Sequence, residues 1–228
     1  AGSDDVEQRV TGGMDLSSSD LELTVDGSRE QVVGMRFAGL SVPVGATVTN
    51  AYVQFRTDEV STGAVSLEIR AEAADNASTY LSTSGNVTSR ALAPGSVAWS
   101  PPDWTTVGAV TTAQRTPNLA ALVQSVVGRP GWAQGNALAL QVSGTGRRTA
   151  EAFEGGASFA PLLHVEYTTG SGGTPTNQAP VVDAGPNRNI AFGGTATLDG
   201  TVSDDGLPDG SVTTRIRGFR FPPPPSNL

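Results

Sequence analysis

The chain has 228 residues with 28 Gly, 15 Pro and no Cys, and its net charge at pH 7 is −8. All 14 basic residues are Arg, and there is a single His. The lack of Cys excludes a disulfide scaffold, a thiol nucleophile and a zinc finger, and one His excludes a multi-histidine metal centre. The acidic balance argues against nucleic acid as a partner, and no apolar run is long enough to predict a membrane span.

Residues 1–168 alternate strand-like runs with Gly-rich turns. From Leu21 to Val25 apolar and polar residues alternate, which is the period-two pattern of a half-buried strand, and Asp26-Gly27 supplies a turn. Further strands are predicted over residues 31–37, 48–55, 65–71, 137–142 and 162–167. We expect the core-facing residues of the 48–55 strand to be Val48, Tyr52 and Phe55. Many short strands joined by turns predict an all-β, jelly-roll-like β-sandwich.

One segment has the period of a helix instead. Thr116 is predicted to be its N-cap and Pro117 its first helical residue, a position where the missing N–H has no consequence. The apolar residues that follow have the spacing of one helical face: Leu119, Leu122, Val123, Val126 and Val127. Gly128 is predicted to end the helix. We therefore expect one short amphipathic helix, about 117–127, which covers an open end or edge of the sandwich.

The chain beyond residue 168 changes in character. Residues 169–180 are rich in Gly, Thr and Pro and lack an apolar anchor, which predicts a linker. Residues 181–228 form a second, shorter segment. From about residue 215 the composition becomes basic and Pro-rich, so we expect this segment to be truncated there. A half sandwich cannot bury its faces alone, so we expect this tail to be loosely ordered unless it pairs with a sheet edge or, by self-association, with another chain.

Several runs in residues 1–168 together resemble the DNRLRE-type domain. They are SDLEL (19–23), QVVGMRF (31–37), GATVTNAYVQF (45–55), SR (89–90), VAW (97–99) with Trp104, QRTP (114–117), RPGW (129–132), GNAL (135–138), GTGRR (144–148) and APLLHVEY (160–167). The resemblance implies a non-catalytic β-sandwich module of secreted bacterial proteins. Some such modules bind carbohydrate, including acidic polysaccharides, and others belong to large surface proteins.

The second segment resembles the start of a PKD-type, immunoglobulin-like repeat. The runs that carry this likeness are NQAPVVDAGP (177–186), ATLDG (196–200) and SDDG (203–206). The resemblance implies an incomplete Ig-like unit, because only 48 residues remain from Val181 onward, and the family's repeats are longer.

Acidic residues near the N-terminus are candidate metal ligands. Ca²⁺ takes six to eight oxygen ligands, and the predicted structural calcium site consists of Asp4, Asp5, Asp20 and Glu22. The alternative is that these acids form a solvated surface. Asp58 and Glu59 are adjacent on a strand and are expected to face opposite sides, so they are not predicted to cooperate as a hydrolase pair.

Aromatic and basic residues are the candidate ligand-binding groups. Trp104 and Trp132 lie in predicted loops, where a ring either stacks against a sugar or covers the core. Guanidinium groups bind carboxylates with two hydrogen bonds, which makes acidic glycans candidate ligands. The Arg residues predicted to bind them are Arg70, Arg90, Arg129, Arg147 and Arg148. The alternative is that they pair with the 22 acidic residues.

Two function classes are therefore expected, and an enzyme is not. The first is a non-catalytic extracellular module that binds polysaccharide and tethers a larger secreted protein. The second is a structural or adhesive subunit of a bacterial surface layer or filament, in which the tail contacts a neighbouring chain. Both place the protein outside the cell or on its surface.

Overall fold

The computed structural model describes residues 2–169, 180–183 and 201–203. The chain divides into two compact units, Ala1–Gly170 and Ser171–Leu228. In the second unit, β13 (Val181–Asp183) pairs antiparallel with β14 (Thr201–Ser203). Nearly all of the predicted linker, most of the Ig-like segment and the change expected near residue 215 lie outside the described residues.

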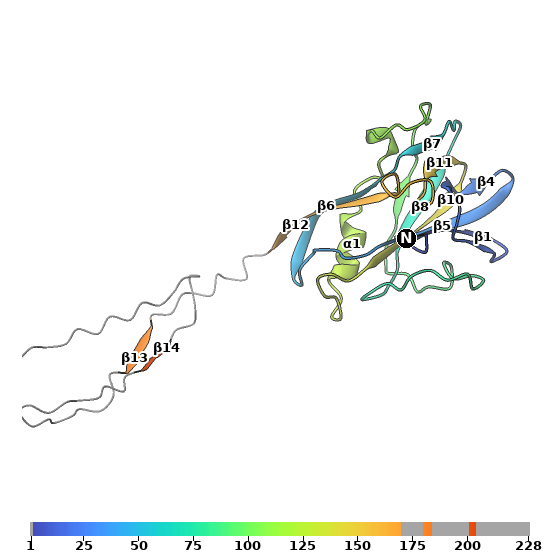
Figure 1. Cartoon of the computed structure of the whole chain (residues 1–228). Coiled ribbons are helices and arrows are strands. Elements are labelled where there is room, and N and C mark those ends of the chain that lie inside the picture. The colour runs from blue at the N-terminus through green and yellow to red at the C-terminus, as the bar shows by residue number, and fades with distance from the viewer. Residues whose placement is uncertain (1, 170–179, 184–200, 204–228) are drawn as a thin grey trace, which may run out of the picture. The chain divides into compact units, whose positions relative to one another are not determined.

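The largest sheet of the first unit has the strand order β2-β1-β5-β10-β8-β9, of which Figure 1 labels β1, β5, β10 and β8. These strands are β1 (Asp5–Arg9), β2 (Met14–Asp15), β5 (Arg29–Phe37), β8 (Ser66–Ala71), β9 (Val97–Trp99) and β10 (Leu138–Thr145), and β4 (Val25–Asp26) also pairs with β5. All neighbours are antiparallel. Strand β5 lies between β1 and β10, so the first strand of the chain pairs with a central strand of the sheet.

Two smaller antiparallel sheets form the opposite side of the core. One has the order β3 (Asp20–Leu23), β11 (Arg148–Glu151), β7 (Thr57–Glu59). The other pairs β6 (Ala46–Gln54) with β12 (Leu162–Thr169). Apolar residues from all three sheets join one buried cluster, for example Leu21 of β3, Val53 of β6 and Ile69 of β8. The prediction of an all-β sandwich with one short helix is confirmed.

The predicted inward orientation of Tyr52 is wrong. Val48 and Phe55 are buried as expected, but Ala51 and Val53 fill the core between them, and Tyr52 is half-buried on the other face. The register between β6 and β12 shifts between Glu166 and Tyr167. This β-bulge inserts an extra residue in β6, which reverses the alternation of its side chains from that point on.

Helix α1 (Ala120–Val127) has the predicted buried face but begins later than predicted. Thr116 is not its N-cap. The Thr116 hydroxyl instead accepts a hydrogen bond from the Val53 amide at 3.0 Å, and the Thr116 amide donates to the Val53 carbonyl at 3.1 Å. The Leu119 amide donates to the Ala51 carbonyl at 2.7 Å, so this segment runs along β6 before the helix starts. The Asn118 side chain accepts from the Ala120 amide at 2.8 Å.

An irregular segment, residues 72–92, covers part of the outer face of the largest sheet. Its Tyr80 and Val87 join a second buried cluster with Val6 of β1. Tyr80 lies so close to β5 that a Cβ at Gly34 would be 2.7 Å from the tyrosine ring carbon Cζ. Gly34 is therefore required for the close approach of this segment to the sheet. Within the described residues, no helix is long and apolar enough to cross a membrane.

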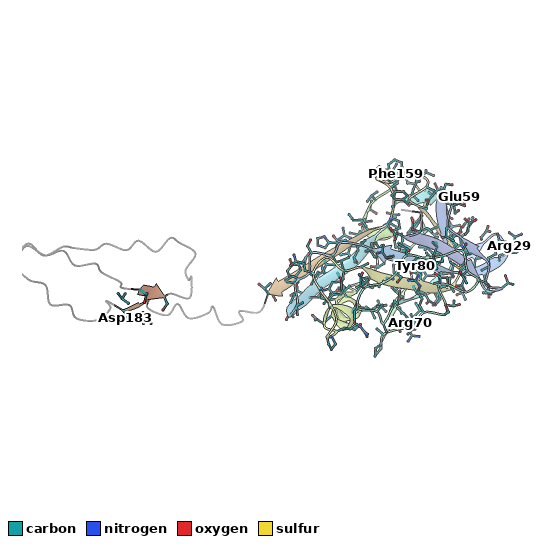
Figure 2. All side chains as sticks on the ribbon, turned by 60° about the horizontal axis from the view of Figure 1, so that its bottom comes forward. Arg29, Glu59, Arg70, Tyr80, Phe159 and Asp183 are labelled. Atoms are coloured by element: carbon teal, nitrogen blue, oxygen red, sulfur yellow. The ribbon has the colours of Figure 1, made fainter. Side chains whose placement is uncertain are left out.

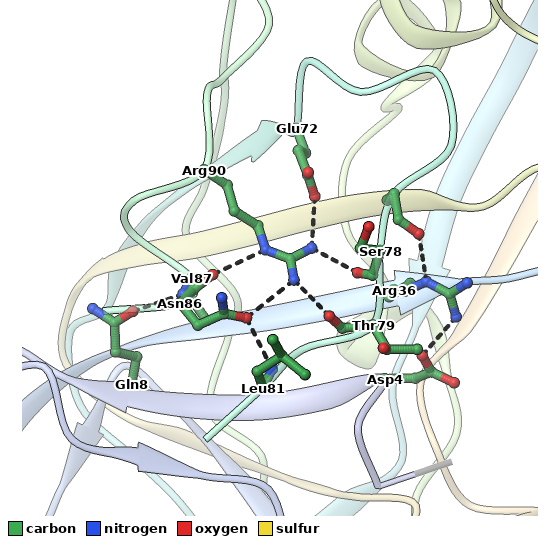
Figure 3. Close-up of polar contacts among 11 residues, drawn as sticks. Asp4, Gln8, Arg36, Glu72, Ser78, Thr79, Leu81, Asn86, Val87 and Arg90 are labelled. Carbon is green, nitrogen blue, oxygen red and sulfur yellow. Dashed lines mark hydrogen bonds and ion pairs between the residues drawn. The ribbon is translucent and has the colours of Figure 1, made fainter. Parts of the chain in front are cut away.

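Arg90 holds this segment together (Figure 3). Its guanidinium donates to the main-chain carbonyls of Asn86, Ser78 and Thr79 at 2.8–2.9 Å. The same group donates to the Glu72 carboxylate at 2.9 Å and lies over the Tyr80 ring, 4.0 Å from its centroid. One side chain thus joins several parts of a segment whose residues lie outside the strands of the sheet.

Candidate functional site

A groove of about 430 Å³ opens between the end of β5 and β12. Its apolar wall is formed by Met35, Phe37, Val42, Phe153, Leu163 and Val165. Leu162 and Tyr167 of β12 also line it, and both are exposed. The Tyr167 hydroxyl donates to the Ser41 carbonyl at 2.9 Å, which fixes the ring beside the groove. A groove of this volume with an apolar wall is typical of small-molecule and cofactor sites.

Three charged side chains lie at one side of the groove. The Arg36 guanidinium is 2.7 Å from the Asp4 carboxylate and donates to the Ala77 carbonyl at 2.7 Å (Figure 3). Asp5 is buried, and one of its carboxylate oxygens accepts from the Phe153 amide at 2.7 Å. Its other oxygen, Oδ1, is buried with no hydrogen-bond partner. A buried acceptor without a donor is costly, so this oxygen suits a ligand that donates a hydrogen bond.

Burial also changes the ionisation of Asp5. Loss of hydration raises the pKa of its carboxyl to about 6, although the Phe153 amide acts in the opposite direction. Glu154 and Asp4 add like-charge repulsion in the same direction as burial. Asp5 is therefore ionised at pH 7 and becomes protonated as the pH falls through about 6.

Neither predicted tryptophan can serve as a sugar-stacking platform here. Trp104 is 0% exposed, and Trp132 is 3% exposed. The indole N–H of each donates to a main-chain carbonyl at 3.0 Å, that of Ala113 and Val42 respectively. Both rings belong to the main hydrophobic core, so the alternative considered for them, a cover over the core, describes their position.

The five predicted Arg residues do not form a common binding surface. Arg148 is 1% exposed and donates to several main-chain carbonyls, so it is structural. Arg90 is engaged within its own segment, and Arg129 pairs with Asp75. Arg147 lies 3.7 Å from Glu59. Arg70 of β8 and Glu59 of β7 lie on opposite sides of the unit (Figure 2), so Arg70 is far from Arg147.

The four predicted calcium ligands lie in two separate pairs. Asp4 and Asp5 are neighbours at the groove, where Asp4 pairs with Arg36, whereas Asp20 and Glu22 are neighbours on β3, where Glu22 also contacts Glu7. Of the four, only Asp20 belongs to a group of three acids with closely spaced oxygens, and its neighbours there are Asp58 and Glu59. The predicted site at Asp4, Asp5, Asp20 and Glu22 is therefore not assembled in the described residues.

The expectation that Asp58 and Glu59 face opposite sides is wrong. One carboxylate oxygen from each lies within 4.8 Å of the other and of an Asp20 oxygen. Thr57 pairs with Ala150, and Glu59 pairs with Thr149, so two steps along β7 match one step along β11. Asp58 is the extra residue of this β-bulge, which brings two successive carboxylates to one face. Burial and the nearby carboxylates raise the pKa of Asp58.

The buried Glu7 and the half-buried Glu22 form a second carboxyl cluster. The Glu7 carboxyl accepts from the Glu22 amide at 2.7 Å and from the Gln31 side chain at 2.6 Å. Burial first, and then the neighbouring Glu22, raises the pKa of Glu7 far above its ordinary value of 4.5. The pair therefore retains a proton at neutral pH.

Replacing Glu7 with Gln is expected to stabilise the protein in alkaline solution. Above pH 4.5 the unfolded chain ionises Glu7 while the folded chain keeps it protonated, so stability falls as pH rises toward the raised pKa. Gln mimics the protonated acid and removes this penalty. Urea unfolding should show a gain of roughly 1–3 kcal/mol at about pH 8 and none at about pH 4. The control Glu30→Gln changes an exposed acid and should leave stability unchanged at both pH values. If Glu7→Gln and Glu30→Gln raised stability equally, the raised pKa of Glu7 would be contradicted.

The single histidine occupies the outer face of the β6–β12 pair. Its ring stacks on Tyr52 with centroids 4.6 Å apart, and its Nε2 lies 2.9 Å from the Glu166 carboxylate. The other neighbour of Tyr52 is Arg115, whose guanidinium lies 4.0 Å from the ring centroid. Hydrogen bonds from His164 and Asn50 lower the pKa of Glu166. Tyr52 is thus held between two side chains.

Sequence reasoning named Asp4 and Asp5 but missed the groove. Its walls come from Asp4 and Asp5, from the continuous stretch 35–42, and from the part of the chain between Phe153 and Tyr167; these three regions are distant in the sequence and share no motif. The short apolar run at residues 160–163 was the signal closest to it.

A scan against protein-family models finds no match for this chain, and a search of curated proteins finds none either.

Proposed function

We propose that the protein is a non-catalytic, extracellular module that binds an uncharged polysaccharide in the groove beside β12. The observation that carries the proposal is a groove of ligand size in which an apolar wall, the exposed Tyr167 ring and the incompletely hydrogen-bonded Asp5 carboxyl lie together. A sugar ring has hydroxyl donors around its rim and apolar C–H faces. The two features of the groove match these two features of a sugar.

The charges at the groove favour uncharged over acidic glycans. Asp4 and Asp5 lie there with Arg36, whose guanidinium is already paired with Asp4 and with a carbonyl. An incoming carboxylate would meet a buried, ionised Asp5, and like charges at short range repel strongly. The net charge of −8 acts in the same direction at long range.

The resemblance to DNRLRE-type domains supports the same proposal. In that family, non-catalytic sandwich modules accompany larger secreted proteins. A composition rich in Gly, Ser and Thr with few charges fits export, and the Gly/Thr/Pro run after residue 168 fits a tether. We therefore place the protein outside the cell or on its surface, as one module of a larger chain.

Affinity electrophoresis in gels that contain soluble polysaccharides tests the proposal. We expect retardation by an uncharged glucan, mannan or xylan and none by alginate or polygalacturonate. Asp5→Asn replaces the unpartnered acceptor with a donor, and Tyr167→Ala removes the exposed ring, so each should weaken binding about tenfold. Because an ionised acceptor binds hydroxyls more strongly, wild-type affinity should fall from about pH 7 to about pH 5.

Tyr52→Ala is the matched control, since Tyr52 lies on the same pair of strands but does not line the groove. It should leave retardation unchanged. If no uncharged polysaccharide retards the protein, or if Asp5→Asn and Tyr167→Ala bind as well as the wild type, the proposed binding groove is wrong. Retardation by alginate that disappears at high salt would instead support an acidic ligand.

A further inference from the structure

Three carboxylates converge on the outer face of the β3-β11-β7 sheet, away from the groove. Asp20 begins β3, and Asp58 and Glu59 come from the bulged strand β7. One oxygen of each lies within 4.8 Å of the other two. Two oxygens that bind the same Ca²⁺ at about 2.3–2.6 Å can be up to about 5 Å apart, so this spacing is one that a single ion can bridge.

A buried hydroxyl on the central strand points to the same face. Thr149 of β11 pairs with Glu22 of β3 on one side and with Glu59 of β7 on the other. Directly paired residues of antiparallel strands present their side chains on the same face of the sheet. Thr149 is fully buried, yet its Oγ1 has no hydrogen-bond partner. A hydroxyl in this position can donate to a ligand carboxylate or to an ion-bound water.

The cations near this cluster leave it short of positive charge. Arg147 lies 3.7 Å from Glu59, and both side chains are exposed. Arg56 lies 3.6 Å from Glu151, the β11 residue that pairs with Asp20. Neither distance is that of a close charge-assisted hydrogen bond, and the exposed Arg147–Glu59 pair contributes little. An ion with charge +2 would reduce the remaining repulsion among the three carboxylates.

We propose that Asp20, Asp58 and Glu59 bind one Ca²⁺ ion, with the Thr149 hydroxyl as a supporting hydrogen-bond donor. The donors are all oxygen, and the chain has no Cys and places its single His on β12, which disfavours Zn²⁺. Mg²⁺ demands a compact octahedron, whereas Ca²⁺ accepts irregular ligand sets completed by water. The ion would join β3 to β7 across β11, the central strand of this sheet.

Calorimetric titration of the EDTA-treated full chain with CaCl₂ tests the site, together with thermal unfolding. We expect saturable binding of one Ca²⁺ and a rise in Tm that MgCl₂ at equal ionic strength does not reproduce. Asp58→Asn should lower the Ca²⁺ affinity at least about tenfold and remove the Tm rise, because it removes a charged ligand. Its Tm without calcium should not fall, since a repulsive charge is lost, which shows that the variant folds.

Two further variants make the result decisive. Thr149→Val keeps the shape of the side chain and removes the unpartnered hydroxyl, so it should weaken Ca²⁺ binding without lowering the Tm of the calcium-free protein. Glu68→Gln removes an exposed acid on β8, in the other sheet, and should leave calcium binding unchanged. The proposal is overturned if Asp58→Asn retains the calcium response, if Mg²⁺ and Ca²⁺ act alike, or if no heat of binding is detected.

Discussion

Trp104→Ala is expected to lower the free energy of unfolding by about 3–5 kcal/mol. Trp104 is fully buried, and its ring packs near Phe55 and Trp99, with centroids 6.3 and 6.4 Å away. Truncation would leave a large cavity and an unsatisfied carbonyl at Ala113, which now accepts from the indole. The loss is a large part of the total stability of a typical domain, so urea melts followed by circular dichroism should detect it easily.

The control for this variant is Val107→Ala, in the same loop. Val107 is 61% exposed, and its truncation should change stability by less than about 0.5 kcal/mol. If Trp104 were instead a sugar-stacking platform, Trp104→Ala would abolish polysaccharide binding and leave the melt nearly unchanged. That outcome would contradict the buried position of the ring.

Arg148→Met should destabilise the protein by about 3–5 kcal/mol, since the buried guanidinium satisfies acceptors that would be left without donors. It donates to the carbonyls of Pro102 and Gly63 at 2.8 Å and to its own neighbour's carbonyl at 2.7 Å. The Asp103 carboxylate, 3.2 Å away, supplies the counter-charge. Burial lowers the pKa of Arg148, in agreement with the loss of hydration around it. The measurement is again urea unfolding at neutral pH.

Arg147→Met is the matched control, because the two residues are adjacent and differ mainly in burial. Arg147 is partly exposed and makes one long contact with Glu59, so its loss should change stability by no more than about 0.5 kcal/mol. Equal effects of the two substitutions would show that Arg148 does not hold the carbonyls together. A loss of anionic-glycan binding on Arg148→Met without loss of stability would restore its predicted ligand-binding role.

The regular parts of this fold could be predicted because their side chains alternate or repeat with a clear period. Leu67 and Ile69 face the core and Glu68 faces solvent, as period two requires. The buried face of α1 followed the helical period equally well. The start of the helix could not be predicted in the same way, because Thr116 and Pro117 suit both a helix N-terminus and an extended segment along β6. The hydrogen bonds between Thr116 and Val53 favour the extended segment.

Two β-bulges account for the largest errors in side-chain orientation. The extra residue in β6 turned Tyr52 outward, and the extra residue in β7 brought Asp58 and Glu59 together. A bulge is a property of the pairing between two strands, so neither strand's own sequence reveals it. Strand β1 was not predicted, for a related reason. Its outward-facing Val6 and Gln8 are covered by the 72–92 segment, so both faces of the strand are buried and its sequence does not alternate between apolar and polar residues.

The candidate groove lay beyond sequence reasoning because distant segments build it. Asp5, Arg36 and Leu163 meet only after β1 pairs with β5 and β12 pairs with β6. Residue type also misled at single positions. A tryptophan in a loop and an arginine both suggested surface recognition, yet Trp104 and Arg148 are among the largest fully buried side chains.

The Arg90 contacts imply an uneven tolerance to substitution in residues 72–92. Three of the acceptors are main-chain carbonyls, at Ser78, Thr79 and Asn86, and every amino acid offers the same carbonyl. Substitutions at residues 78 and 79 should therefore leave these hydrogen bonds intact. No other amino acid supplies the donors of the Arg90 guanidinium, so position 90 should not tolerate substitution. Lysine, with one compact ammonium, cannot reach the same set of acceptors in one plane. Sequence diversity in this segment should therefore surround an invariant arginine.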